Sequence, residues 1–200
     1  MGTSKPLLCF DEKTALELVL TAAAEAGVSG SVVVVGKNGR EVMEAHALLR
    51  LSSETRWAFN EEEGSEQLRS LQIGLESLRG EALDGFFFHP VDHPLATSED
   101  YKLLLGALAA DRSGVNVFIL SHASRRGHPI LCRGALGPRF LQLSSSQTAR
   151  EVIDRETLSY VLTPNAHVLE DMDTPEDYRK LVGLYRERNE ALSKRQGRKP

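Results

Sequence analysis

The sequence has only two cysteines, Cys9 and Cys132, and their spacing is not that of metal ligands. This usage fits a reducing compartment and gives no reason to expect a disulfide. No apolar stretch reaches the roughly 18 residues that a membrane span requires, and the amino end lacks the basic and then apolar layout of a signal peptide. We therefore expect a cytoplasmic protein without membrane contact.

The chain also lacks an excess of charge of one sign. Its 24 basic and 28 acidic residues give a formal net charge of −4 and are mixed along the sequence. No broad cationic surface therefore points to a nucleic acid partner. A hydrophobic content of 41% over 200 residues suits one core and not two. We expect a single domain over residues 1–192 and a disordered basic tail over residues 193–200.

The most informative stretch is an apolar run that ends in a carboxylate. Three phenylalanines open the run, which predicts a strand from Gly85 to Asp92 that is buried on both faces of a parallel sheet. Ligands of open α/β sheets bind at the carboxyl ends of such strands. The alternative is that Asp92 simply ends a strand. We expect His89 to be a hydrogen-bonded core histidine and His93 to lie at the mouth of a cleft.

Strand and helix patterns alternate along most of the chain. The other strands are expected at residues 31–36, 56–59, 115–120, 158–162 and 167–169, with a hairpin arm near 127–132. The helices are expected at residues 12–26, 39–50, 65–79, 97–110, 147–156 and 175–192. The alternation predicts an α/β fold with right-handed crossovers and a mostly parallel sheet covered by helices on both faces.

Several helix starts carry capping residues. Thr97 with Asp100, and Thr174 with Asp177, have the spacing of capping boxes. Asn38 is placed to cap the helix that follows it. These residues are expected to act in helix initiation and not in chemistry.

Acidic and basic side chains could converge at one edge of the sheet: Lys5, Asp92, and Asp171 with Asp173. Two carboxylates from separate loops can hold one Mg²⁺, which prefers oxygen ligands and leaves positions open for phosphate oxygens. A lysine beside them adds positive charge for a triphosphate, a combination suited to in-line transfer at phosphorus. The alternatives are local turn chemistry for the two later aspartates and a solvated Lys5 near a frayed terminus.

Five segments, in order along the chain, carry a family resemblance. They are residues 1–8, Asn60 with Gly64 and 70–75, 91–94, 126–130 and 171–178. They resemble motifs of the MobA-like NTP transferases: Arg-Met-Gly-x-x-Lys, Asn…Gly…Ser-Leu-x-x-Gly-Leu, Asp-x-Pro and two further blocks. The Gly-His-Pro and Asp-x-Asp-Thr-Pro-Glu-Asp forms are most similar to the molybdenum-cofactor cytidylyltransferase branch.

The resemblance implies a Rossmann-like nucleotidyltransferase fold with three α/β/α layers. A phosphate group of a molybdopterin-type cofactor precursor would attack the α-phosphorus of an NTP, with CTP favoured and GTP possible, and pyrophosphate would leave. By the same resemblance, Lys5 and Asp92 are catalytic. Lys5 contacts the triphosphate and Asp92 binds Mg²⁺. Either Asp171 or Asp173 completes the metal site. A molybdoenzyme or its chaperone is an implied protein partner.

The resemblance also assigns residues to the substrate pocket. Gly127 and His128 would shape the site of the acceptor, and Asn60 and Ser70 would lie near the nucleotide or the acceptor. Arg125 and Arg126, beside Gly127, are either an ordinary solvated pair or residues that steer a phosphate.

The chain departs from the family pattern at its amino end. The family's first strand and glycine-rich turn should precede Met1, and that turn supplies N–H groups that bind phosphates. Without the strand, its neighbours would have exposed edges. We expect the true start of the protein to lie upstream of Met1. One alternative is an impaired remnant that only binds a nucleotide or a partner, and another is an enzyme with a sugar phosphate as acceptor.

Overall fold

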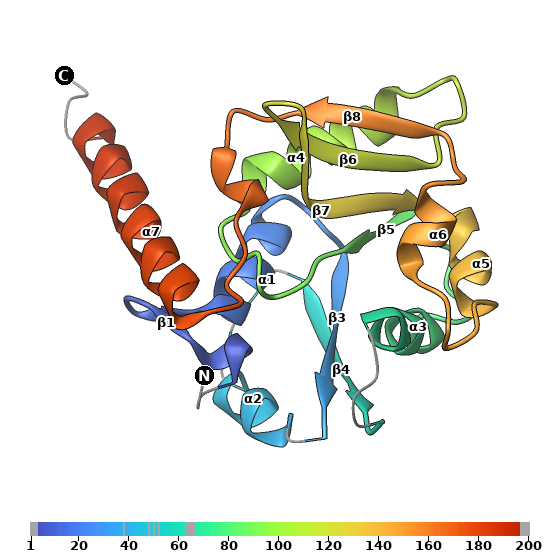
Figure 1. Cartoon of the computed structure of the whole chain (residues 1–200), viewed down its shortest axis with the longest axis horizontal. Coiled ribbons are helices and arrows are strands. Elements are labelled where there is room, and N and C mark those ends of the chain that lie inside the picture. Colours follow the sequence, from blue (N-terminus) through green and yellow to red (C-terminus); the bar gives the residue numbers. More distant parts are fainter. Residues whose placement is uncertain are drawn as a thin grey trace.

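The computed structural model describes residues 4–37, 39–47, 49, 51, 53–62 and 67–196 (Figure 1). The segments Met1–Thr3, Asn38, Gly64 and 197–200, on which some expectations rest, lie outside these residues. The elements in the first half are η1 (Lys5–Leu7), β1 (Cys9–Phe10), β2 (Lys13–Thr14), α1 (Ala15–Glu25), β3 (Gly30–Gly36), α2 (Arg40–Ala45), β4 (Glu54–Asn60), α3 (Gln67–Ser77) and β5 (Gly85–Phe88).

The second half of the chain continues the alternation of strands and helices. Its elements are α4 (Ser98–Ala110), β6 (Val117–His122), β7 (Arg125–Arg133), η2 (Gly134–Leu136), α5 (Gly137–Leu141), α6 (Ala149–Ile153), β8 (Leu158–Leu162), η3 (Ala166–Leu169) and α7 (Pro175–Gln196). The expected α/β organisation is therefore confirmed element by element over most of the described chain, with the differences given below.

The main strands form two separate ladders. β3 pairs with β4 in parallel, and a second sheet has the order β5-β7-β6-β8. In that sheet β6 and β8 are parallel, whereas β7 is antiparallel to both β5 and β6. The phenylalanine strand was expected to pair in parallel. This expectation is wrong, because among the described residues β5 pairs with β7 alone, and that pairing is antiparallel. A tight turn joins β6 to β7, and in it Ala123 and Ser124 have φ of 47° and 61°. This turn reverses the chain, so β7 runs antiparallel beside β6 and presents its other edge to β5.

Three other expectations need correction. The phenylalanine strand ends at Phe88 and not at Asp92, since Pro90 has no N–H to continue a ladder. The expected strand at 167–169 is the 3₁₀ helix η3, whose first turn is capped because the Asn165 side chain accepts a hydrogen bond from the His167 N–H. The expected disorder of 193–196 is wrong, because α7 continues to Gln196.

The hydrophobic core lies on both faces of the larger sheet. Along β6, Val117 and Ile119 pack into one cluster with residues of α3, α5 and α6, while Phe118 and Leu120 pack into another with residues of α1 and α4. Side chains alternate across a strand, so β6 is buried on both sides and lies in the middle of three layers. No helix in the described ranges is long and apolar enough to cross a membrane.

Candidate active site

A small apolar cluster brings three distant segments of the chain together. This cluster contains four fully buried side chains, those of Phe10, Leu95, Met172 and Leu181. They come from the hairpin after η1, the loop after β5, the segment before α7, and α7 itself. Met172 is buried while Asp171 and Asp173 on either side of it are exposed. Its burial therefore holds the acidic segment against the loop that carries Asp92.

Two hydrogen bonds join these acidic loops directly. The backbone N–H of Met172 donates to the carbonyl oxygen of Asp92 at 3.0 Å. The Nδ1 atom of His93 lies 3.0 Å from the carbonyl oxygen of Glu170, and because a carbonyl only accepts, this nitrogen carries the proton. The two loops are therefore joined by one backbone hydrogen bond and one hydrogen bond from a side chain to the backbone.

Lys5 connects the carboxylates of the two loops. Its Nζ atom lies 2.6 Å from Oδ1 of Asp173 and 3.5 Å from Oδ2 of Asp92. Partial burial lowers the pKa of Lys5, but the hydrogen bond and charge of Asp173 and the charge of Asp92 raise it above its usual value. Lys5 is therefore an ammonium that neutralises two aspartates. The exposed fractions are 33% for Lys5, 20% for Asp92 and 67% for Asp173.

The sequence left open whether Asp171 or Asp173 accompanies Asp92. Asp173 is the one that Lys5 contacts. Asp171 is exposed, and within the described ranges no hydrogen bond or ion pair connects it to Lys5 or Asp92. The geometry therefore favours Asp173 as the second acidic residue of the cluster.

One oxygen of the Asp92 carboxylate has no hydrogen-bond partner. This oxygen, Oδ1, is buried, and Nε2 of His93 lies 3.9 Å from it. A buried carboxylate oxygen without a donor is costly, and a bound cation would satisfy it. Among the described residues, no group of three or more His, Cys, Asp or Glu side chains could hold a metal ion. Mg²⁺ does not require three protein ligands, because it commonly uses one or two carboxylates and takes phosphate oxygens and water as its other ligands. The pair Asp92 and Asp173 fits that requirement.

Two histidines lie side by side next to Asp92. The ring centroids of His93 and His128 are 4.4 Å apart, and Nδ1 of His128 is buried with no hydrogen-bond partner. Burial, and then the neighbouring His93, lower the pKa of His128 to about 4, although Asp92 opposes this shift. His128 is therefore neutral at pH 7, with one buried ring nitrogen that has no hydrogen-bond partner. The sequence placed His93 only at the mouth of a cleft, whereas its bond to Glu170 also helps to join the acidic loops.

His89 has the structural role that was expected for it. Its Nε2–H donates to the carbonyl oxygen of His93 at 2.9 Å, and Nδ1 accepts from the Tyr101 hydroxyl. Burial is the main reason that the pKa of His89 falls to about 3. His89 is a neutral core histidine that orients the loop carrying Asp92.

Gly127 acts through close packing. A Cβ at this position of β7 would lie 2.6 Å from Cγ2 and 2.8 Å from the carbonyl oxygen of Val168 in η3. The missing side chain lets η3 approach β7. Its neighbour Arg126, for which phosphate steering was an alternative, pairs with Asp154 at 2.9 Å and with the Tyr160 hydroxyl at 3.1 Å.

Asn60 and Ser70 contact each other at the carboxyl end of β4. The Asn60 side-chain amide donates to the Ser70 hydroxyl at 3.2 Å, and its Oδ1 atom accepts from the Glu62 N–H. Asn60 is buried, with 6% exposed. The two residues thus belong to the β3–β4 side of the molecule, and Ser70 lines a cavity together with Val91.

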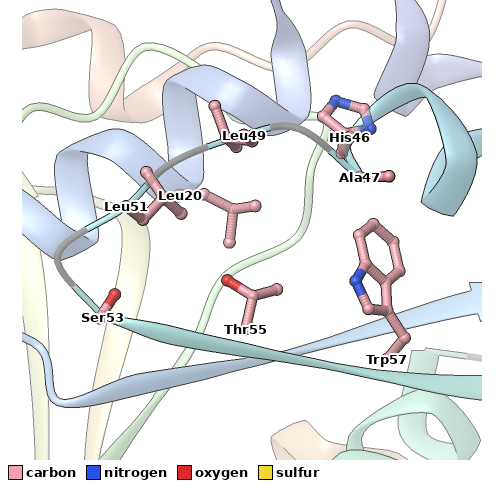
Figure 2. A pocket seen from close by; sticks show the side chains of 8 residues that line it. All are labelled: Leu20, His46, Ala47, Leu49, Leu51, Ser53, Thr55 and Trp57. Carbon is pink, nitrogen blue, oxygen red and sulfur yellow. The ribbon is translucent and has the colours of Figure 1, made fainter.

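A second, smaller pocket was not anticipated from the sequence. It has a volume of about 240 Å³ and lies between Leu20 of α1, residues that follow α2, and β4. Figure 2 shows the rings of His46 and Trp57 at one end and the hydroxyls of Ser53 and Thr55 nearer Leu51. Those two hydroxyls are buried without a described hydrogen-bond partner. None of the residues proposed for the active site lines this pocket.

Several solved structures are similar to the chain over nearly its whole length. Rv0371c from Mycobacterium tuberculosis H37Rv shares 21% identity, with a TM-score of 0.75 over 92% of this chain and 91% of that one. Its manganese complex shares 19%, with a TM-score of 0.72 over 91% and 93%. A nucleotidyl transferase from Methanothermobacter thermautotroptrophicus shares 21%, with a TM-score of 0.72 over 92% and 85%.

A further similar structure is the molybdopterin-guanine dinucleotide biosynthesis protein A of Archaeoglobus fulgidus. It shares 11% identity, with a TM-score of 0.64 over 92% of this chain and 91% of that one. At these identities the likenesses show the fold, which is the expected Rossmann-like nucleotidyltransferase fold. A search of curated protein sequences gave no match. The model of the MobA-like NTP transferase domain matches residues 1–160, so the chain belongs to this family.

Proposed function

We propose that the chain transfers a nucleoside monophosphate from an NTP to a phosphate group of a molybdopterin-type acceptor and releases pyrophosphate. CTP is the favoured donor and GTP the second candidate, and Mg²⁺ is the metal. The observation that carries the proposal is the contact of Lys5 with both Asp92 and Asp173, because it gathers two carboxylates and one ammonium from loops far apart in the sequence.

The two aspartates are the residues that would hold the metal. Bound there, Mg²⁺ would neutralise charge on the phosphates and on the leaving pyrophosphate. The unpartnered Oδ1 of Asp92 supports this assignment. Lys5 lies beside both carboxylates, so phosphates held at that position are within reach of its ammonium group.

The transfer needs no strong base from the protein. A phosphate monoester has a second pKa near 6 and is mostly dianionic at pH 7. One of its oxygens forms the new bond to the α-phosphorus while the bond to the pyrophosphate oxygen breaks, so the protein acts by positioning and charge neutralisation. The neutral His128 can orient the acceptor through its unpartnered Nδ1 atom.

The solved structures support the proposal without deciding the substrate. One similar protein is described as a manganese complex and another as a protein of molybdopterin-guanine dinucleotide biosynthesis. A 4-diphosphocytidyl-2C-methyl-D-erythritol synthase is also similar, with a TM-score of 0.69. An alcohol phosphate or sugar phosphate therefore stays the second candidate for the acceptor.

A second candidate function is binding of nucleotide or a partner without turnover. The observation that favours it is the division of the main strands into two ladders, because a continuous sheet holds catalytic loops more rigidly. Calorimetric titration with CTP and GTP in the presence of Mg²⁺ separates the two functions. Binding without pyrophosphate release favours the binding protein, and turnover excludes it.

The test is a pyrophosphate-release assay with each of four NTPs, Mg²⁺, and either a molybdopterin-type or a sugar-phosphate acceptor. We expect release with CTP and the molybdopterin-type acceptor. Asp92→Asn should lower it by about 100-fold or more, as expected for loss of a catalytic charge contact, whereas Asp171→Asn should leave it nearly unchanged. Release that survives Asp92→Asn would remove the support for the proposal.

A further inference from the structure

The pocket drawn in Figure 2, which we call the side pocket, has an apolar wall and a polar one. Leu20, Leu49 and Leu51 form the apolar wall, and Ser53 and Thr55 line the other. The hydroxyl oxygens of Ser53 and Thr55 are buried and have no hydrogen-bond partner among the described residues. Figure 2 shows both oxygens on the side of β4 that faces Leu20 and Leu51. A buried hydroxyl without a partner costs free energy, which an occupant that bonds to it would recover.

Two aromatic rings form one end of the side pocket. The ring centroids of His46 and Trp57 are 6.3 Å apart, and the ring planes are tilted by 38°. Both nitrogens of His46 have partners in the fold, because Nδ1 lies 2.6 Å from the Val42 carbonyl oxygen and Nε2 lies 2.7 Å from the Thr14 hydroxyl. His46 therefore presents only its ring to an occupant. Figure 2 shows the indole nitrogen of Trp57, a hydrogen-bond donor, on the side of the ring nearer Thr55.

The charge and size of the side pocket limit what it can hold. None of the described side chains that line it carries a carboxylate, ammonium or guanidinium group, so an ion would lose its hydration without gaining a counter-charge. The volume is about 240 Å³, whereas an apolar cavity of about 150 Å³ is enough to bind benzene. The side pocket thus has room for one aromatic ring with a polar substituent. Ala47 lines it and is exposed, so a ligand can enter beside this residue.

We propose that the side pocket binds a small uncharged molecule that has one aromatic ring and one hydroxyl or amide group. The ring of this molecule lies against the leucines and Trp57, and its polar group bonds to the hydroxyls of Ser53 and Thr55. None of the residues proposed for the active site lines the side pocket. The proposal therefore concerns a separate site and does not depend on the proposed function.

The test uses the full chain and the fluorescence of Trp57, which is its single tryptophan. The probes are benzyl alcohol and toluene, which share a ring and differ by one hydroxyl. The first measurement is a saturable change in the Trp57 emission during titration with each probe. The second is the urea midpoint of unfolding, because a molecule that binds only the folded chain raises it. Neither measurement needs a nucleotide or a metal, so failure of the proposed function leaves this test intact.

We expect benzyl alcohol to bind at least as tightly as toluene. In a pocket without polar partners the alcohol would lose its hydrogen bonds to water, and it would bind about tenfold more weakly than toluene. Ser53→Ala/Thr55→Val removes both hydroxyls and should weaken benzyl alcohol binding about tenfold relative to toluene. The urea midpoint of this variant without a probe should not fall, because the hydroxyls it loses make no hydrogen bond. Toluene binding by the variant would show that the pocket is still formed.

Three results would overturn the proposal. The first is no saturable change in the Trp57 emission with either probe, which means that the side pocket holds water only. The second is toluene binding at least tenfold more tightly than benzyl alcohol to the unaltered chain, because the hydroxyls then make no bond to the ligand. The third is an unchanged preference between the two probes in Ser53→Ala/Thr55→Val, because the alcohol group then lies elsewhere.

Discussion

The backbone N–H of Met172 donates a hydrogen bond to the carbonyl oxygen of Asp92, with 3.0 Å between the two atoms. This bond connects the loop after β5 to the segment before α7. It places the side chain of Asp92 near that of Asp173, and Lys5 contacts both. The acidic pair is therefore positioned by the fold and not by a ligand, and such pre-organisation lowers the cost of ordering the side chains when a ligand binds.

Asp173→Asn is expected to weaken binding of Mg²⁺-CTP by about tenfold or more, which corresponds to about 1.4 kcal/mol. The reason is loss of one of two carboxylates near Lys5. Asp171→Asn is the matched control, because it removes the same charge one residue before the buried Met172. Calorimetric titration of both variants checks the prediction. A larger loss with Asp171→Asn would reverse the assignment.

Lys5→Met is expected to change metal and nucleotide binding in opposite directions. Lys5 neutralises both aspartates, so without it free Mn²⁺ should bind more tightly, by about 2 kcal/mol or roughly 30-fold for a divalent ion near 4 Å from one charge in water. Metal-free CTP should bind more weakly, because a cation for its phosphates is lost. Lys13→Met, at an exposed lysine in β2, is the control. Weaker Mn²⁺ binding in Lys5→Met would contradict the account.

His89 is expected to make the fold sensitive to acid. Its pKa is about 3 in the folded state and near 6.5 in an unfolded chain. Below pH 6.5 the unfolded chain takes up a proton that the folded one does not, so stability that is present above pH 6.5 is lost as the pH falls towards 3. The loss approaches about 1.4 kcal/mol per pH unit, or about 3 kcal/mol at pH 4.5.

His89→Phe is the variant that isolates this contribution. It should be less stable at pH 7, because the hydrogen bonds to Tyr101 and His93 are lost. Its free energy of unfolding should nevertheless fall less steeply between pH 6 and pH 4.5, by about one proton's slope. Urea unfolding of both proteins over this range measures the difference. Parallel curves would show that His89 is not the residue that takes up the proton.

Asp100→Ala is expected to destabilise the fold by about 3 kcal/mol, as loss of a fully buried and hydrogen-bonded carboxylate does. Asp100 is 1% exposed. It completes the capping box with Thr97 and also accepts from Thr163 and Asn165. Asp177→Ala removes the same capping interaction from the exposed start of α7 and should cost much less. Thermal unfolding of the two variants tests this, and equal losses would contradict it.

Local signals in the sequence predicted the elements well. The capping boxes at Thr97 and Thr174 are both present, and the valine run forms β3 as expected, because each depends on residues close together in the chain. The pairing partner of β5 was not predictable in this way. It depends on where the β6–β7 turn sends the chain, and that turn contains no glycine.

The candidate site could be predicted only in part from the sequence. The order of the motifs along the chain indicated Lys5, Asp92 and the aspartates at 171 and 173. The preference for Asp173 depends on which side of the buried Met172 faces Lys5, and no sequence pattern carries that information. The unpartnered nitrogen of His128 likewise depends on its packing against His93.

The most direct test is a count of bound Mn²⁺ by electron paramagnetic resonance, in the presence and absence of CTP. The account predicts that the unaltered chain binds one Mn²⁺ per molecule with CTP, and that Asp92→Asn abolishes this binding while Asp171→Asn retains it. Equal Mn²⁺ binding by the unaltered chain and by Asp92→Asn would contradict the assignment of this cluster as the metal site.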